Sequence, residues 1–152
     1  MSILVVDDTR IMRIVIKEIL VKNCGIPPAS IYEADSGPAA IRDFRRINPE
    51  IVFLDINMPD MSCIDVVKKI LEKHPQAYII MCTSSKNRSD VVQCISAGAR
   101  DYITKPPTAE RLLGALIKAN PDFIRKGEGT ETPKEKDEAL ETPKETDEAL
   151  AT

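Results

Sequence analysis

Residues 3–8 read "ILVVDD", four apolar side chains followed at once by two adjacent aspartates. A short continuous apolar run is typical of a strand that is buried on both faces of a parallel sheet. Two like charges at the end of such a strand repel each other, which costs free energy unless a counter-charge is present. The pair Asp7-Asp8 therefore raises the question of what it binds.

Four more apolar runs follow along the chain, and each of the five precedes a segment in which apolar residues recur with helical spacing. This alternation predicts an α/β fold of the (βα)5 type, an open, doubly wound parallel sheet of five strands with helices on both faces. At 152 residues the chain is too short for an eight-stranded barrel. The predicted strands span residues 3–6, 31–34, 51–54, 78–81 and 102–103, and the predicted helices span residues 11–21, 39–47, 64–71, 91–97 and 112–117.

The composition is that of a soluble globular domain, with 43% hydrophobic and 30% charged residues. No apolar run approaches the roughly 20 residues that span a bilayer, and the early charges of Asp7 and Asp8 argue against a signal peptide. We therefore expect a cytoplasmic protein without membrane insertion. The cysteines show no C-x-x-C spacing, so we expect them to be small buried side chains in a reducing compartment. They are Cys24, Cys63, Cys82 and Cys94.

The sequence changes character after residue 120, so we place the globular domain at residues 1–120. Residues 131–150 are a tandem repeat, "ETPKEKDEAL ETPKETDEAL", whose copies differ only by Lys136 against Thr146. Each copy contains a helix-start signal, but a helix of about eight residues is too short to be stable alone in water. We therefore expect residues 121–152 to form a disordered acidic tail. A partner-binding motif and a segment that folds back on the body are the alternatives.

Net charge is divided unevenly along the chain. Residues 1–130 hold 18 Lys and Arg against 16 Asp and Glu, whereas residues 131–152 hold 3 against 8, which together give the formal charge of -3. A near-neutral body with an acidic tail has no electrostatic footprint for nucleic acid, and the sequence shows no helix-turn-helix pattern. We therefore expect the protein to act through protein contacts and not to bind nucleic acid.

Polar side chains follow four of the five predicted strands, where a parallel sheet gathers its functional groups. Each alone has a plain structural explanation, such as a helix start for adjacent aspartates, but the whole set is improbable by accident. Three carboxylates at one edge raise each other's pKa, and a hard cation such as Mg²⁺ removes that cost. The paired aspartates are therefore interpreted as half of a metal site for Mg²⁺, with Mn²⁺ as a substitute. The polar residues at this edge are Asp7, Asp8, Asp55, Thr83, Ser84 and Lys105.

Four stretches of the chain resemble the receiver domain of two-component response regulators. They are "ILVVDD", "VFLDINMPDM", "MCTSS" and "AGARDYITKP", and the resemblance covers about residues 2–119. It implies a flavodoxin-like fold with the strand order 2-1-3-4-5. The stretch "DDTRIMR" and the lack of an appended folded domain are most similar to the stand-alone, chemotaxis-type (CheY-like) members.

The resemblance implies that Asp55 is the phosphoacceptor, whose carboxylate attacks the phosphoryl group of a phosphohistidine or of a small acyl phosphate. It also implies that Asp7, Asp8 and Asp55 bind Mg²⁺ together with the backbone carbonyl of Asn57. The ion would neutralise charge between the acceptor and the phosphoryl oxygens in a loose transition state.

Further residues are expected to bind the phosphoryl group and to report its presence. Lys105 would pair with a phosphoryl oxygen, and its bond to Pro106 is cis in the family. The Thr83 hydroxyl, at the strand end that also carries Ser84, would move toward the phosphoryl group. The space that it vacates would let Tyr102 turn inward. The plainer interpretation of Tyr102 is a half-buried strand aromatic.

The resemblance also implies the partners. A sensor histidine kinase or a phosphotransfer protein would supply the phosphoryl group, because the single histidine, His74, is expected to be a surface loop residue. The switch would change the conformation of the face made by the fourth helix, the fifth strand and the fifth helix, and this face would bind a downstream protein. Arg88, Val92 and Ile95 would lie on that face.

Two positions depart from the family pattern. Cys63 stands where a glycine is common in the family. Because glycine is often chosen for a positive φ, the backbone conformation at Cys63 is expected to depend on whether this position needs one. Ser85 stands where chemotaxis-type members often carry an acidic residue, which leaves the lifetime of the phosphorylated state open.

Three other functions share part of this pattern. An aspartyl-nucleophile phosphohydrolase usually presents Asp-x-Asp after the first strand and needs a substrate pocket or cap domain. A flavin-binding module would need a Ser/Thr/Gly-rich phosphate loop at that point, and Asp7 and Asp8 would repel a phosphate. A phosphorylation-independent scaffold of the same fold usually lacks an acid or the acceptor. We therefore expect a phosphoacceptor switch, whose own activity is limited to autophosphorylation and autodephosphorylation.

Overall fold

A computed structural model of the chain describes residues 1–84 and 88–122. The chain divides into two compact units, Met1–Ala115 and Leu116–Thr152. Most of the predicted acidic tail, from residue 123 onward, and Ser85 lie outside the described residues.

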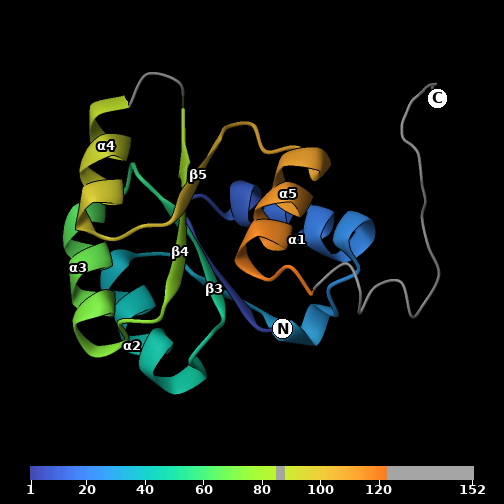
Figure 1. Cartoon of the computed structure of the whole chain (residues 1–152), viewed down its shortest axis with the longest axis horizontal. Helices are drawn as coiled ribbons and strands as arrows, with labels where there is room; N and C mark the ends of the chain where they lie inside the picture. Colours follow the sequence, from blue (N-terminus) through green and yellow to red (C-terminus); the bar gives the residue numbers. More distant parts are fainter. Residues whose placement is uncertain (85–87, 123–152) are drawn as a thin grey trace. The chain divides into compact units, whose positions relative to one another are not determined.

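The first unit is built on a five-stranded parallel sheet in the order β2-β1-β3-β4-β5 (Figure 1). The predicted fold class and the strand order implied by the family resemblance are thereby confirmed. The third, fourth and fifth strands extend beyond the predicted ends, so that they include Asp55, Thr83 and Thr104. The strands are β1 (Ile3–Val6), β2 (Ile31–Ala34), β3 (Ile51–Asp55), β4 (Tyr78–Thr83) and β5 (Asp101–Thr104).

Helices cover both faces of this sheet. Helix α1 lies on one face, and α2, α3 and α4 lie side by side on the other (Figure 1). The helices are α1 (Arg10–Cys24), α2 (Gly37–Ile47), α3 (Cys63–Lys73), α4 (Arg88–Ala97) and α5 (Ala109–Ala119). A short 3-10 helix, Pro28–Ser30, was not predicted.

The helix ends follow local chemistry. Helix α1 runs three residues beyond its predicted end and stops at Gly25, whose φ of 73° is a conformation that glycine adopts without strain. Ser36 begins α2 by accepting a hydrogen bond from the backbone N–H of Ala39. Ser62 begins α3 in the same way, through the N–H of Ile64.

The central strands are apolar on both faces, as their continuous hydrophobic runs predicted. All four residues of β1 and the first four of β3 are buried. Phe44 of α2 and Val66 of α3 pack in the core on the face that α2, α3 and α4 cover. Burial of this apolar surface holds the strand ends, and hence the polar residues beyond them, in fixed positions.

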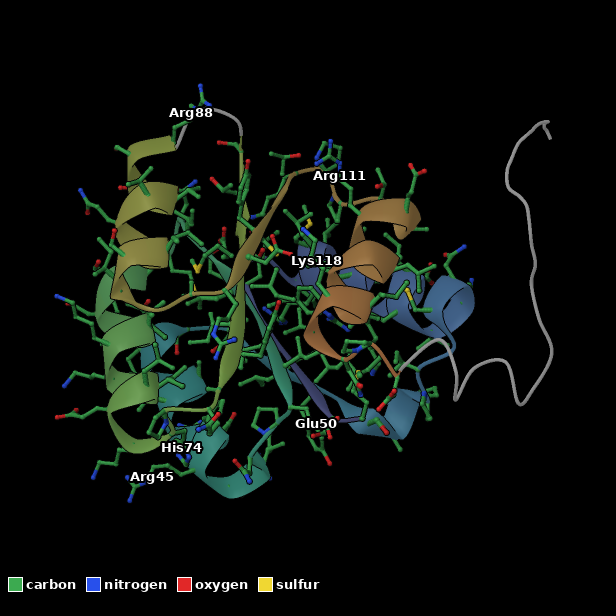
Figure 2. All side chains as sticks on the ribbon, viewed as in Figure 1. Arg45, Glu50, His74, Arg88, Arg111 and Lys118 are labelled. Atoms are coloured by element: carbon green, nitrogen blue, oxygen red, sulfur yellow. The ribbon has the colours of Figure 1, made fainter. Side chains whose placement is uncertain are left out.

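His74 lies directly after α3, in the helix-to-strand loop where the sequence predicted it, but it is half-buried rather than fully on the surface. It follows the last residue of α3 and lies beside α2 (Figure 2), and its ring centroid lies 4.5 Å from that of Phe44. Its Nε2 atom is buried and has no hydrogen-bond partner among the described residues. The adjacent Pro75 predicted the end of the helix and an exposed loop, but the packing of α3 against α2 places the His74 ring against the core.

Candidate functional site

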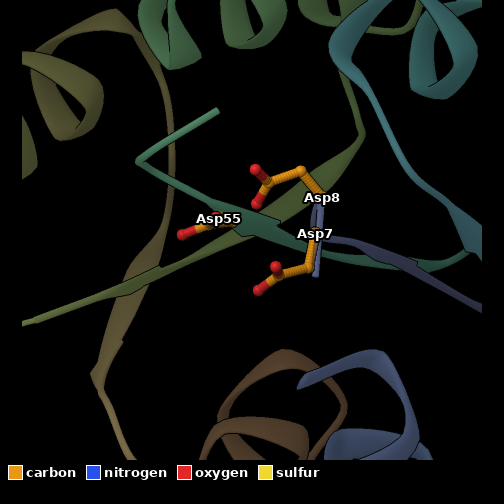
Figure 3. Close-up of side chains that lie close together, drawn as sticks. All are labelled: Asp7, Asp8 and Asp55. Atoms are coloured by element: carbon orange, nitrogen blue, oxygen red, sulfur yellow. The ribbon is translucent and has the colours of Figure 1, made fainter. Parts of the chain in front are cut away.

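Three carboxylates meet at the carboxyl edge of the sheet (Figure 3). Asp7 and Asp8 follow β1, and Asp55 ends β3. One carboxylate oxygen from each residue lies within 4.8 Å of the others. Asp7 and Asp55 are almost fully buried, with 1% and 3% of their surface exposed, whereas Asp8 is exposed. The cluster is therefore open to solvent on the side of Asp8.

The sheet itself produces this cluster. Strands β1 and β3 are hydrogen-bonded neighbours, with Val6 paired to Leu54, so the residues that follow them emerge side by side. The backbone N–H of Asp7 donates to the carbonyl of Ala34 at 3.1 Å, which extends the pairing with β2 by one residue. The position of Asp7 is thus set by main-chain hydrogen bonds rather than by a flexible loop.

Lys105, which follows β5, is the cation that faces the buried carboxylates. Its Nζ atom donates a hydrogen bond to Asp55 Oδ1 at 2.8 Å and another to Asp7 Oδ2 at 3.1 Å. The backbone N–H of Lys105 donates to the carbonyl of Thr83 at 2.7 Å, and the peptide bond between Lys105 and Pro106 is cis. The ammonium group is therefore held against two of the three acids.

The charges of this site perturb the groups that share it. Burial raises the pKa of Asp55, the charge of Asp7 adds to the rise, and the hydrogen bond from Lys105 opposes it. Burial alone would lower the pKa of Lys105, but its contacts with Asp55 and Asp7 outweigh burial, so the pKa is raised. Three acids thus face one firmly protonated amine, an arrangement that favours binding of a further cation.

The donor set fits a hard divalent cation. Carboxylate oxygens are the ligands that Mg²⁺ prefers, and the exposed side of the cluster leaves room for the waters that this ion retains. Asp7 Oδ1 also accepts the backbone N–H of Thr9 at 2.8 Å, which fixes the carboxylate orientation. Arg13 donates to the backbone carbonyl of Asp7 at 2.7 Å and to Glu33 at 3.0 Å. Arg13 thus connects α1 to the carboxyl edge of the sheet, a role that the sequence did not predict.

Asn57 lies beside the cluster through its backbone. Its N–H donates to Asp55 Oδ1 at 3.3 Å, so the loop that follows β3 folds back over the carboxylate. Coordination of an ion by the Asn57 carbonyl stays a prediction. Cys63 begins α3 and is not among the described residues with a positive φ, so the substitution of the usual glycine does not impose that strain here.

The three remaining predicted residues belong to the last two strands of the sheet: Thr83 ends β4, Ser84 follows it, and Tyr102 lies on β5. Thr83 is buried at the end of β4, and its hydroxyl donates to the Ser84 carbonyl at 2.9 Å. Tyr102 on β5 is 50% exposed. With residues of α4 they line a groove of about 530 Å³. The groove residues are Thr83, Ser84, Arg88, Val91, Val92, Ile95, Ser96, Tyr102 and Thr104.

The structure therefore brings Asp7, Asp8, Asp55 and Lys105 into one cluster. It places Tyr102 apart from them, in the groove that Thr83 and Ser84 also border. Among the described residues, no helix is long and apolar enough to cross a membrane.

Comparison with known proteins places this chain in a family. The response regulator receiver domain model matches residues 3–117. The chain is 43% identical over 116 residues to the chemotaxis protein CheY of Bacillus subtilis, which covers 76% of this chain and 94% of that protein. It is 38% identical over 118 residues to CheY of Thermotoga maritima, which covers 78% of this chain and 96% of that protein.

A solved structure supports the same assignment. The receiver domain of NtrX from Brucella abortus superposes with a TM-score of 0.70 at 29% identity, over 78% of this chain and 97% of that one. The paired acids after β1, the buried acid that ends β3 and the lysine after β5 all fall within the matched range. This chain belongs to the response regulator receiver domain family.

Proposed function

We propose that this protein is a CheY-like phosphoacceptor switch that takes a phosphoryl group on Asp55 in a Mg²⁺-dependent reaction and signals through protein contact. The observation that carries the proposal is the position of Asp55, which is buried between two further acids and within hydrogen-bond distance of Lys105. An isolated structural ion pair would not need the second and third carboxylates.

The residues present suit transfer of a phosphoryl group to a carboxylate. An oxygen of Asp55 would form a bond to phosphorus as the bond from phosphorus to the donor breaks, and the donor's leaving group would keep that electron pair. Lys105 would pass its hydrogen bond from Asp55 to a phosphoryl oxygen that arrives beside it. Mg²⁺, when bound by Asp7, Asp8 and Asp55 with the Asn57 carbonyl, would supply neutralisation of the negative charge that gathers there.

The phosphoryl donor is proposed to be another protein. The chain has a single histidine, and the packing of His74 against Phe44 after α3 supports a donor outside this chain. A sensor histidine kinase or a phosphotransfer protein would provide the group, in the cytoplasm. Relatives that carry the name chemotaxis protein make chemotaxis the proposed pathway.

The groove between α4 and β5 is the proposed output surface. Thr83 connects it to the acidic cluster, because its hydroxyl bonds the Ser84 carbonyl while its strand pairs with the one that carries Asp55. A phosphoryl group on Asp55 would offer that hydroxyl a stronger, charged acceptor. Loss of the Ser84 contact would free the groove edge and let the half-exposed Tyr102 change its position.

The test is intact mass spectrometry after incubation with acetyl phosphate, with Mg²⁺ or with a chelator. We expect a Mg²⁺-dependent gain of about 80 Da, absent in Asp55→Asn and retained in Asp60→Asn, which removes an exposed acid of the same loop. Two negative results together would point to a phosphorylation-independent scaffold. The wild-type protein would bind Mg²⁺ yet gain no mass, and beryllofluoride would not shift the NMR resonances of α4.

A further inference from the structure

Two cysteines from different helices meet next to the proposed output surface. Cys63 is the first residue of α3, and Cys94 lies in the second half of α4. Their sulfur atoms are 3.0 Å apart, although the residues are 31 positions apart in the sequence. Cys63 is 4% exposed and Cys94 is fully buried. No sequence signal pairs them, because neither belongs to a C-x-x-C motif.

The placement of the two sulfurs requires little change for a covalent bond. A disulfide has an S–S length of about 2.04 Å, so the sulfurs would need to approach by about 1 Å. Helices α3 and α4 already pack side by side on one face of the sheet (Figure 1). The movement required is therefore that of two short side chains and not of the helices that carry them.

The two thiols also differ in character, as an attacking and a resolving thiol do. The hydrogen bond with Cys94 lowers the pKa of Cys63, and a further hydrogen bond from the backbone N–H of Ile64 at the start of α3 acts in the same direction. The pKa of Cys94 is raised, first by that hydrogen bond and then by burial. Thiolates react with peroxides and thiols do not, and Cys63 is also the more exposed of the two side chains, so Cys63 is the sulfur expected to react first.

The remaining cysteines provide a contrast within the same chain. Burial raises the pKa of Cys24 to about 11 and that of Cys82 to about 12. Cys24 is 8% exposed, more than Cys63, so exposure alone does not distinguish the pair. The close contact between two sulfurs is what sets Cys63 and Cys94 apart.

We propose that Cys63 and Cys94 form a redox-modification site, in which a hydroperoxide converts the dithiol into an intramolecular disulfide between α3 and α4. In the first step the Cys63 thiolate attacks the peroxide, the O–O bond breaks, and Cys63 becomes a sulfenic acid as the peroxide leaves as water or an alcohol. In the second step Cys94 attacks the Cys63 sulfur, an S–S bond forms and water leaves. A dithiol reductant reverses the change by thiol–disulfide exchange.

The modification would act on the proposed output surface, and this consequence rests on the proposed function. Val91 and Ile95 of α4 line the groove; Ile95 follows Cys94 directly and Val91 lies about one helical turn before it. A bond from Cys94 to the first turn of α3 would hold α4 in its present position. If phosphorylation requires α4 to move, oxidation would disfavour the phosphorylated state, and reciprocal coupling would slow modification of Asp55.

The test is peptide mapping of the full-length protein after exposure to hydrogen peroxide and blocking of free thiols. Trypsin places the four cysteines in four separate peptides, 23–42, 47–68, 74–86 and 89–100. We expect a cross-linked species of peptides 47–68 and 89–100, lost after dithiothreitol. A cross-link between any other pair, or oxidation of Cys63 to sulfinic acid without a cross-link, would overturn the proposal, as would four unreacted thiols.

Variants separate the pair from unspecific oxidation. Cys63→Ser should abolish the cross-link, and it keeps a small polar side chain at the first position of α3. Cys24→Ser should leave it intact. Cys94→Ala removes a fully buried side chain, so the mapping of wild-type protein decides the question if this variant fails to fold.

A second measurement addresses the coupling to function. The rate of the mass gain from acetyl phosphate should fall about fivefold or more in oxidised wild-type protein and stay unchanged in peroxide-treated Cys63→Ser. If reduced protein never gains mass, the proposed function fails while the cross-link still stands. If the cross-link forms and the rate is unchanged, the disulfide site stands and its coupling to α4 is refuted.

Discussion

Lys105 and Asp55 are 50 positions apart in the sequence, yet the ammonium of one donates a 2.8 Å hydrogen bond to the carboxylate of the other. The same ammonium reaches Asp7 at 3.1 Å. A buried carboxylate without a partner costs several kcal/mol, so Lys105 offsets part of the cost of placing two acids together. The site is thus partly neutralised by its own chain.

Loss of this cation should destabilise the ion-free protein. We expect Lys105→Ala to lower the free energy of unfolding by about 1–3 kcal/mol at neutral pH, because two buried acids lose a charged hydrogen-bond donor. Urea denaturation in the presence of a chelator measures the effect. Lys22→Ala is the matched control, since Lys22 forms an exposed pair with Glu18, and it should change stability by less than about 0.5 kcal/mol. Equal effects of the two substitutions would contradict the role of Lys105.

Neutralisation of Asp55 should stabilise the ion-free protein in a pH-dependent way. The folded state raises the pKa of Asp55, so it binds that proton more tightly than the unfolded state does. The contribution of Asp55 to stability therefore falls as pH rises from the ordinary carboxyl pKa, about 3.9, through the raised value.

We accordingly expect Asp55→Asn to be more stable than wild type by about 0.5–2 kcal/mol at neutral pH. The difference should shrink toward zero as the pH is lowered to about 4, where the wild-type carboxyl becomes protonated. Urea titrations of both proteins at several pH values, with a chelator present, give the comparison. A stability difference that does not vary with pH would show that charge is not its cause.

Mg²⁺ should stabilise the protein through the acidic cluster. At a free concentration of about 100 times its dissociation constant, an ion that binds the folded state alone adds about 2.7 kcal/mol. Asp8→Ala should weaken this binding about tenfold or more, since it removes one carboxylate from the set. Because Asp8 is exposed, the ion-free stability should change little.

The control for the metal prediction is Asp60→Ala, which removes an exposed acid from the loop after β3. Thermal unfolding with increasing Mg²⁺ reports the binding for each variant. If Asp60→Ala reduced the stabilisation as much as Asp8→Ala does, general surface charge rather than the cluster would account for it.

A glycine between α4 and β5 should tolerate no side chain. Gly98 has a φ of 126°, and an added Cβ atom would overlap the side chain of Leu71 on α3. We expect Gly98→Ala to destabilise the fold by about 1–3 kcal/mol. Gly114→Ala, inside α5 with open space around the added atom, should instead stabilise by about 0.5–1 kcal/mol. Chemical denaturation distinguishes the two, and matching signs would refute the argument.

The strands and the acidic cluster could be predicted because both depend on local sequence and on one topological rule. Apolar runs mark buried strands, and parallel strands bring their carboxyl ends to one edge, which placed Asp7 beside Asp55. Helical spacing alone does not decide how far the apolar face of α1 is buried, because Ile11, Val15 and Ile19 recur at the same four-residue intervals as Met12, Ile16 and Leu20. The structure buries Ile16 and leaves Ile11 71% exposed.

Contacts between helices could not be predicted in the same way. The approach of Cys63 to Cys94 depends on how α3 and α4 pack, and the ring contact of His74 with Phe44 depends on how α2 meets α3. The sequence determines these distances through the whole core at once, and no short pattern reports them. The double contact of Lys105 likewise depends on where β5 lies relative to two strands that it does not join.

The pairing of β1 with β3 has a consequence for the choice of ion. Hydrogen-bonded strands lie about 4.8 Å apart, so the separation of the Asp7 and Asp55 carboxylates is set mainly by the main chain. Mg²⁺ requires ligands at about 2.1 Å, whereas Ca²⁺ accepts about 2.3–2.6 Å. Leu4 and Val52 are paired core residues that hold the two strands in place, although they do not belong to the acidic cluster. We therefore expect substitutions there that shift the strands to change the preference of the site between Mg²⁺ and Ca²⁺.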